Sequence, residues 1–315
     1  MSKDVKFLIA APSYSPNSGG AMVLHHLCHL INEIGQASVV PMPRGAVVNW
    51  LNIQHIDKII QEEKRQLSNF NVAPELNTPI HHGKIDPEFT VAVYPEVVFG
   101  NPFQLKHVAR WILYHSGFHR RMNCTSQGEI EFKFNEDFIG STISGFSSPS
   151  DIILNIVLPN EVDFKMLKNR VNGSAQPENN SRVGTAFCIR KGKFQKHRLI
   201  NEDSICVDNE GIDKIREIMQ TVEYFVSFDP QTYLSNLAVV CGCKSVVVDP
   251  DVCSTDIETL KKLHLQRPWL AYSDDQISGN SYTQRELLSY FETCTKASRK
   301  NVKNFVNFWR SCLNQ

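Results

Sequence analysis

The stretch that decides the fold runs from Val222 to Pro250 and reads VEYFVSFDPQTYLSNLAVVCGCKSVVVDP. Its first residues are β-branched and aromatic, which favours a buried strand. A helix is expected next, with Asp229 as its N-cap, Pro230 at its first position and Gly242 at its end. Residues 245–248 then return to strand chemistry. This order predicts a strand–helix–strand unit of a parallel sheet.

Ligands of parallel sheets bind beyond the carboxyl ends of the strands. The pattern therefore places Asp229, Gln231 and Thr232 at a helix N-terminus, where free backbone N–H groups favour an anion such as phosphate. Asp229 fits a structural cap better than a ligand contact. Thr232 fits a ligand contact and an ordinary helix surface equally well.

Composition describes an ordinary globular protein. The 315 residues suffice for two domains or one large one, and 42% of them are hydrophobic. Lys+Arg and Asp+Glu number 33 each, which argues against a nucleic-acid-binding protein. No apolar run approaches the roughly 18 residues of a membrane span, and the apolar core of MSKDVKFLIAAP is too short for a secretory signal. Nine scattered cysteines favour reduced thiols and a cytoplasmic location.

Hydrophobic periodicity predicts further α/β units along the chain. Strands are expected at 6–11, 38–40, 90–94, 151–158 and 186–190. Helices are expected at 22–34 with Gly35 as the stop, at 50–70, at 103–113 and from 285 to the end. The best linker is the polar stretch NGSAQPENNSR at 172–182.

Four segments together resemble the GT-B glycosyltransferases, a likeness that covers most of the chain. They read PNSGGAMVLHHLCHLINEIG, VAVYPEVVFGNPFQLKHVARWILYHSGF, FCIRKGKF and SFDPQTYLSNLAVVCGCKSVVV. The resemblance implies an α/β fold with two Rossmann-like domains facing a cleft. It assigns residues 1–175 to an acceptor-side domain, 183–289 to a nucleotide-sugar-binding domain, and 290–315 to a helix that crosses back onto the first domain.

The resemblance also implies an activity, which is hexosyl or pentosyl transfer from a nucleotide-sugar donor to a glycan hydroxyl in polysaccharide biosynthesis. Neither a cofactor nor a metal is expected, because the nucleotide sugar is a substrate. In one respect the sequence departs from the family. Many GT-B enzymes hold the donor ribose with a glutamate, and that position is Leu237 here, next to Asn236. Either Thr232 or another group holds the ribose instead, or donor binding is altered or lost, and Asn236 is assigned to the donor site.

Candidate site residues follow from these placements. Gly19 and Gly20 lie at a strand-to-helix turn, where glycine allows a positive φ and lets a ligand approach the backbone closely. In a transferase this turn would face the donor phosphates or the acceptor, and a plain tight turn explains the two glycines equally well. Arg190 and Lys191 end a strand, where their charges would neutralise a departing nucleoside diphosphate. The alternative is a solvated basic turn, because further basic residues follow them. Glu96 follows the strand VAVY and is either the base that an inverting transferase needs or a carboxylate that bonds backbone N–H groups.

Other chemistry-bearing side chains have simpler explanations. His25 and His29 lie four residues apart beside Cys28, but helix packing accounts for them better than zinc does. Cys241 and Cys243 are expected in the core, and His115, His119 and Asp137 are weak candidates. A solvated helix face explains the basic residues Lys106, Arg110, Arg120 and Arg121.

Two other functions stay open. A non-catalytic binding or scaffold subunit would keep the fold and lack chemistry, as Leu237 suggests. A sugar-nucleotide epimerase would turn over the nucleotide sugar without an acceptor. The sequence leaves open the donor, the acceptor, the stereochemistry and the oligomeric state, and it is compatible with peripheral membrane contact.

Overall fold

The computed structural model describes residues 4–16, 18–42, 70–117, 128–140, 147–173, 182–249, 256–277 and 280–314. The chain divides into two compact units. The first comprises Met1–Leu158 together with Cys294–Gln315, and the second comprises Pro159–Thr293. The sequence prediction placed the boundary in 172–182 instead, so the helix at Glu161–Val171 falls in the second unit.

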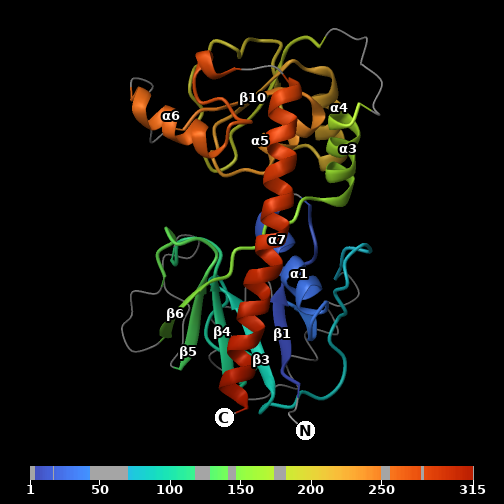
Figure 1. Ribbon diagram of the computed structural model, residues 1–315, viewed down its shortest axis with the longest axis vertical. Coiled ribbons are helices and arrows are strands. Elements are labelled where there is room, and N and C mark those ends of the chain that lie inside the picture. The colour runs from blue at the N-terminus through green and yellow to red at the C-terminus, as the bar shows by residue number, and fades with distance from the viewer. Residues whose placement is uncertain are drawn as a thin grey trace. The chain divides into compact units, whose positions relative to one another are not determined.

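The first unit is built on a parallel sheet of six strands with the order β2-β1-β3-β4-β5-β6. Its elements are β1 (Lys6–Ala11), α1 (Gly19–Ile31), β2 (Gln36–Pro41), β3 (Thr90–Pro95), β4 (His107–Ile112), β5 (Glu129–Lys133), β6 (Ser147–Ile153) and the part of α7 (Asn280–Leu313) from Cys294 onward. Figure 1 shows α1 and this part of α7 lying over one face of the sheet.

The two faces of this sheet carry separate cores because side chains alternate along each strand. One core packs Phe7, Ile9 and Trp111 against α1 and against Phe305 and Trp309 of α7. On the other face, Ala10, Ala92 and Tyr94 pack against loop residues that include Val98 and Phe103. The loop that follows β3 thus covers the face of the sheet opposite the helices.

The second unit has a parallel sheet of four strands with the order β10-β9-β7-β8. Its elements are α3 (Glu161–Val171), β7 (Thr185–Cys188), β8 (Ile205–Cys206), α4 (Ile212–Thr221), β9 (Tyr224–Ser227), α5 (Leu234–Cys241), β10 (Lys244–Val247), α6 (Ile257–Gln266), η2 (Asp274–Gln276) and the start of α7. Helices α4 and α5 bury Ile215 and Leu237 against Ala186 and Phe225 of the sheet.

Each strand order contains one point at which the chain reverses its direction across the sheet. The chain passes from β1 to β2 on one side and then to β3 on the other side of β1. In the second unit it passes from β7 to β8 and then to β9 on the other side of β7. Open parallel sheets bind ligands at such switch points, beyond the carboxyl ends of the strands.

Most strand predictions are confirmed, including 6–11 and 90–94, and the parallel α/β class is as expected. The helix predicted at 103–113 is wrong, because residues 107–112 form β4, and Gln104 before it has a φ of 52° that no helix accommodates. The strand predicted at 151–158 lies earlier, as β6, and ends at Ile153. The helix predicted at 50–70 lies almost wholly outside the described residues, as does most of the linker at 172–182.

The start of the helix in the deciding stretch also differs from the prediction. Helix α5 begins at Leu234, so Asp229 is not its N-cap and Pro230 is not its first residue. Local hydrogen bonding explains the difference, since the Asp229 carboxylate and carbonyl accept from the Gln231 and Thr232 amides and close a turn. The predicted stop is confirmed, because Gly242 ends α5 with a left-handed φ of 93°.

Candidate functional site

Arg190 stands at the switch point of the second sheet, two residues beyond the end of β7. Its backbone is left-handed, with a φ of 49°, a conformation that is strained for a residue with a side chain. Its Nε is buried and has no hydrogen-bond partner within the described part of the chain. Asp208 Oδ1 lies 3.6 Å from this Nε, which is close enough for ion pairing and too far for a hydrogen bond. Strain and an unmet donor together mark a position of functional interest.

Asp208 fixes the backbone on which Arg190 stands. Its carboxylate accepts from the amide of Ile189, with the shorter distance 2.9 Å, and from the amide of Arg190 at 3.4 Å. The backbone then turns, as the Gly192 amide donates to the Ile189 carbonyl at 2.8 Å. This turn carries Lys191, whose side chain is exposed. The two cations predicted to act together therefore share one tight, carboxylate-anchored turn.

Gly192 lets this turn pack against the end of β9. A Cβ on Gly192 would lie 1.7 Å from the Phe228 carbonyl oxygen, so no other residue fits there without moving the backbone. The Phe228 amide in turn donates to the Cys188 carbonyl at 3.0 Å. The carboxyl ends of β7 and β9 are thereby held together, which brings the Arg190 turn to the segment that begins at Asp229.

Of the site residues predicted after β9, Asp229 has a structural role and Thr232 is accessible to a ligand. The buried Asp229 accepts from the Gln231 amide at 3.0 Å and so acts as the structural residue that the sequence favoured. Thr232 is half-buried, and its Oγ1 accepts from the Leu234 amide at 3.3 Å at the start of α5. Thr232 therefore lies just before the start of α5, whose N-cap is Tyr233, four residues after the predicted N-cap.

Asn236 and Leu237 serve packing. The Asn236 Oδ1 accepts from the indole Nε1 of Trp269 at 2.8 Å. Leu237 is fully buried in the core between α4, α5 and the sheet. A leucine at the position where the resembled family holds ribose thus contributes to the core of this unit.

In the first unit, Gly19 and Gly20 form the exposed first turn of α1. Neither has a positive φ, so the expected left-handed turn is not what these glycines provide. A Cβ added to either would meet nothing within 4 Å. Ser18 caps the helix by accepting from the Ala21 amide at 3.4 Å. Among the described residues, nothing therefore packs against these two glycines at the carboxyl end of β1.

Glu96 follows β3 at the same edge and is buried. Its Oε2 accepts from the Leu113 amide at 3.0 Å, just beyond the end of β4. This contact is the backbone bond that the sequence offered as one of two explanations of Glu96. It also fixes the carboxylate beside the switch point of the first sheet.

Arg110 is the candidate whose surroundings the sequence analysis misjudged, because it lies in a strand and not on a solvated helix face. It lies on β4, is fully buried, and binds Glu129 through Nε at 2.8 Å and Nη2 at 2.6 Å. Its remaining N–H groups donate to the carbonyls of Pro95, Val98 and Gly100. The guanidinium therefore holds the loop that carries Glu96. The only sequence signal was a lone arginine inside the apolar run VARWIL.

The other sequence candidates have structural roles or ordinary surface positions. His25 is buried and its Nε2 lies 3.0 Å from the Pro12 carbonyl, while His29 Nδ1 accepts from the Asn77 amide at 3.0 Å, so the two do not form a metal pair. His115 Nδ1 accepts from the Ile139 amide. Lys106 pairs with Glu88 at 2.8 Å, and Asp137 is exposed. His119, Arg120 and Arg121 lie outside the described residues.

Cys28, Cys241 and Cys243 are buried, and burial determines the state of their thiols. It raises the pKa of the Cys241 and Cys28 thiols to about 12, which keeps both protonated. Cys243 is buried as well, and its thiol donates to the Met219 carbonyl at 2.9 Å. Both Cys241 and Cys243 are core residues, as the sequence predicted. Within the described ranges, no group of His, Cys, Asp and Glu side chains could hold a metal ion.

No family model matches this chain, and no curated protein matches it. Among solved structures, the chain is similar to the spinosyn forosaminyltransferase SpnP, with 9% identity and a TM-score of 0.32. The alignment covers 97% of this chain and 95% of that chain. A TM-score of 0.32 establishes neither a shared fold nor a shared activity. No helix among the described residues is long and apolar enough to cross a membrane.

Proposed function

We propose that this protein is a glycosyltransferase that moves a sugar from a nucleotide-sugar donor to a glycan hydroxyl without a metal ion. The observation that carries the proposal is Arg190, a strained residue with an unmet buried donor at the switch point of a parallel sheet. A nucleoside diphosphate offers an acceptor oxygen for this Nε–H, which Asp208 at 3.6 Å does not reach, together with negative charge that pairs with the guanidinium.

The donor site would be the Arg190 turn together with the start of α5. A departing diphosphate gains negative charge as the glycosidic bond breaks, and fixed cations lower the energy of that state. Arg190 and Lys191 would supply them. The hydroxyl of Thr232, which accepts from the Leu234 amide and keeps its own hydrogen, would donate to a phosphate oxygen. Asn236 is left out of this proposed contact set because its amide oxygen is bonded to Trp269.

The acceptor side is proposed in the first unit, where Glu96 and the first turn of α1 share one sheet edge. In an inverting reaction Glu96 would take the proton of the attacking hydroxyl. The hydrogen bond from the Leu113 amide would hold the carboxylate in place for this role. In a retaining reaction the donor phosphate would take that proton, and Glu96 would orient the acceptor.

A second candidate is a binding subunit without catalysis, and one observation favours it. Leu237 fills the core where the resembled enzymes bind ribose, so the donor would lose that contact. Such a protein would bind a nucleotide and release no nucleoside diphosphate. An epimerase would convert the nucleotide sugar with no acceptor present.

Thermal-shift screening against UDP, GDP, CMP, dTDP and their sugars tests the proposal. A ligand at about 100 times its Kd adds roughly 2.7 kcal/mol, which raises Tm by a few degrees. Arg190→Ala and Lys191→Ala should each weaken this shift. Lys196→Ala, an exposed lysine in the same basic segment, is the matched control and should keep it.

Product analysis then separates the candidates. Mass spectrometry of a reaction with the bound nucleotide sugar should show nucleoside diphosphate that increases when acceptor glycans are added. Binding without turnover would support the binding subunit, and a converted sugar without release would support the epimerase. Failure of every nucleotide to shift Tm would contradict the donor site itself.

A further inference from the structure

We propose that a pocket at the amino ends of β1, β2 and β3 binds a phosphate group, either free or as the ester of a sugar-sized molecule. The pocket lies within the first unit and has a volume of about 330 Å³, the size of a small-ligand site. It is at the opposite end of the strands from Glu96 and the first turn of α1. Nothing in the proposed transferase chemistry uses it.

The floor of the pocket is set by strand register. Lys6 pairs with Gln36 on one side and with Thr90 on the other, while Leu8 pairs with Ser38. Register partners in a parallel sheet project to the same face, so these five side chains share one surface. Farther along the strands the same face is apolar and packs in the core. The change from apolar to polar side chains leaves a hydrophilic hollow that no core packing requires.

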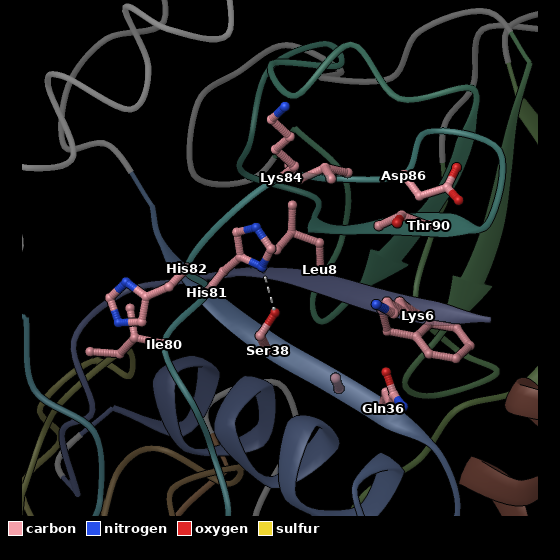
Figure 2. A pocket seen from close by; sticks show the side chains of 13 residues that line it. Lys6, Leu8, Gln36, Ser38, Ile80, His81, His82, Lys84, Asp86 and Thr90 are labelled. Atoms are coloured by element: carbon pink, nitrogen blue, oxygen red, sulfur yellow. Dashed lines mark hydrogen bonds between the residues drawn. The ribbon is translucent and has the colours of Figure 1, made fainter. Parts of the chain in front are cut away.

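The segment from Ile80 to Asp86 forms the opposite wall, and its backbone is tied to β2. The Val39 amide donates to the Pro79 carbonyl, and the His81 amide donates to the Val39 carbonyl, each at 2.9 Å. Figure 2 shows the His81 ring in this pocket with its hydrogen bond to Ser38. Because the wall is hydrogen-bonded to the strand, the pocket is a formed feature of the fold.

His81 is held from both ring nitrogens. Its Nε2 lies 3.2 Å from the Gly83 carbonyl, which can only accept, so Nε2 carries the hydrogen. Its Nδ1 lies 3.3 Å from Ser38 Oγ and in the neutral ring accepts the serine hydrogen. Protonation of Nδ1 reverses this bond and frees the serine hydroxyl to donate into the pocket. A bound anion and a protonated His81 therefore favour each other.

Basic side chains lie near the His81 ring. Lys6, His82 and Lys84 line the pocket, and in the described part of the chain none of the three has an ion-pair partner. Burial lowers the pKa of His81, the hydrogen bond to the Gly83 carbonyl opposes this, and the nearby His82 and Lys6 add to the lowering. Asp86 also lines the pocket and is the single carboxylate there. A phosphate dianion would offset the repulsion among the cations, and Asp86 would suit a hydroxyl of the attached molecule.

Binding is best measured at the pocket itself, through the NMR signals of the histidine rings. His81 is assigned by the signal that disappears in His81→Gln. Titrations use inorganic phosphate, glucose 6-phosphate and glucose, in an Arg190→Ala/Lys191→Ala background that removes the proposed nucleotide site. We expect a saturable shift of the His81 signal with phosphate or glucose 6-phosphate and none with glucose. Tighter binding of the ester identifies a phosphorylated polyol, and equal binding identifies free phosphate.

The variants Lys6→Gln and Lys84→Gln, combined, should weaken binding at least tenfold, whereas Lys106→Gln should leave it unchanged. Sulfate, which stays fully ionised, serves as the probe of pH, and its affinity should rise as the pH is lowered from about 7 to about 5 and His81, whose pKa is lowered from 6.5, gains a proton. No shift with either phosphate compound, or affinity that the double variant retains, would overturn the proposal. Because the Arg190 and Lys191 changes are already present, this result is independent of the transferase proposal.

Discussion

Replacing Arg110 with methionine should cost the first unit a large part of its stability. The guanidinium uses all five of its N–H donors, two on the Glu129 carboxylate and three on loop carbonyls. Methionine fills similar space and donates nothing, so a buried carboxylate and three carbonyls lose their partner. Removing one member of a buried ion pair costs about 3–5 kcal/mol, against a total of about 5–15 kcal/mol for a typical domain.

A double-variant cycle isolates the ion pair from the loss of packing. Glu129→Leu alone should also be strongly destabilising, because it leaves a buried guanidinium charge. The combined variant Arg110→Met/Glu129→Leu should lose less than the sum of the two, by about 2 kcal/mol or more.

Urea unfolding followed by tryptophan fluorescence measures these changes, and hydrogen exchange of peptides spanning 95–113 locates them. Hydrogen exchange is needed because two compact units can unfold in separate transitions. Additive single and double variants, or a cost below about 1 kcal/mol for Arg110→Met, would refute the reasoning.

Three further predictions concern packing, thiols and pH. In the urea assay, Gly192→Ala should lower the free energy of unfolding by about 3 kcal/mol or more, because its Cβ would meet the Phe228 carbonyl. The control Gly211→Ala should cost no more than about 1 kcal/mol, because its Cβ would meet nothing within 4 Å among the described residues. In the native protein a thiol reagent should label the exposed Cys206 and Cys312 before Cys28, Cys188 and Cys241, whose pKa burial raises to about 12, and peptide mapping that finds the buried thiols labelled first would contradict this. Burial, with the charges of His29 and His25, lowers the pKa of His26 from 6.5 to about 4. The unfolded chain then binds the extra proton, so stability is full above about pH 6.5 and falls by about 3 kcal/mol as pH drops to 4. His26→Leu should reduce that fall, and an unchanged pH profile would show that His26 is not responsible.

The parts of the fold that the sequence predicts are those with local signals. Strands β1, β3 and β9 are short runs of β-branched and aromatic residues, and Gly242 marks its helix end by its left-handed φ. Strand β4 was not predicted, because it is buried on both faces and its sequence therefore shows no alternation of apolar and polar residues. Its apolar residues also fit a helical spacing, and its arginine looks like a solvated residue until the pairing with Glu129 is known.

The candidate sites divide in the same way. Arg190 and Lys191 could be predicted because they follow directly on a visible strand. The left-handed φ of Arg190 and its anchoring by Asp208, 18 residues away along the chain, leave no local signal. The phosphate pocket could not be predicted from the sequence, because Lys6, Ser38 and Thr90 come together only through the register of three strands.

Hydrogen exchange with and without a saturating nucleoside diphosphate tests the central claim most directly. The account predicts slower exchange in peptides covering 188–196 and 228–236, at the carboxyl ends of β7 and β9. It also predicts that this protection disappears in Arg190→Ala. Protection confined to other segments, or protection at these two that survives the loss of Arg190, would contradict the assignment of the donor site.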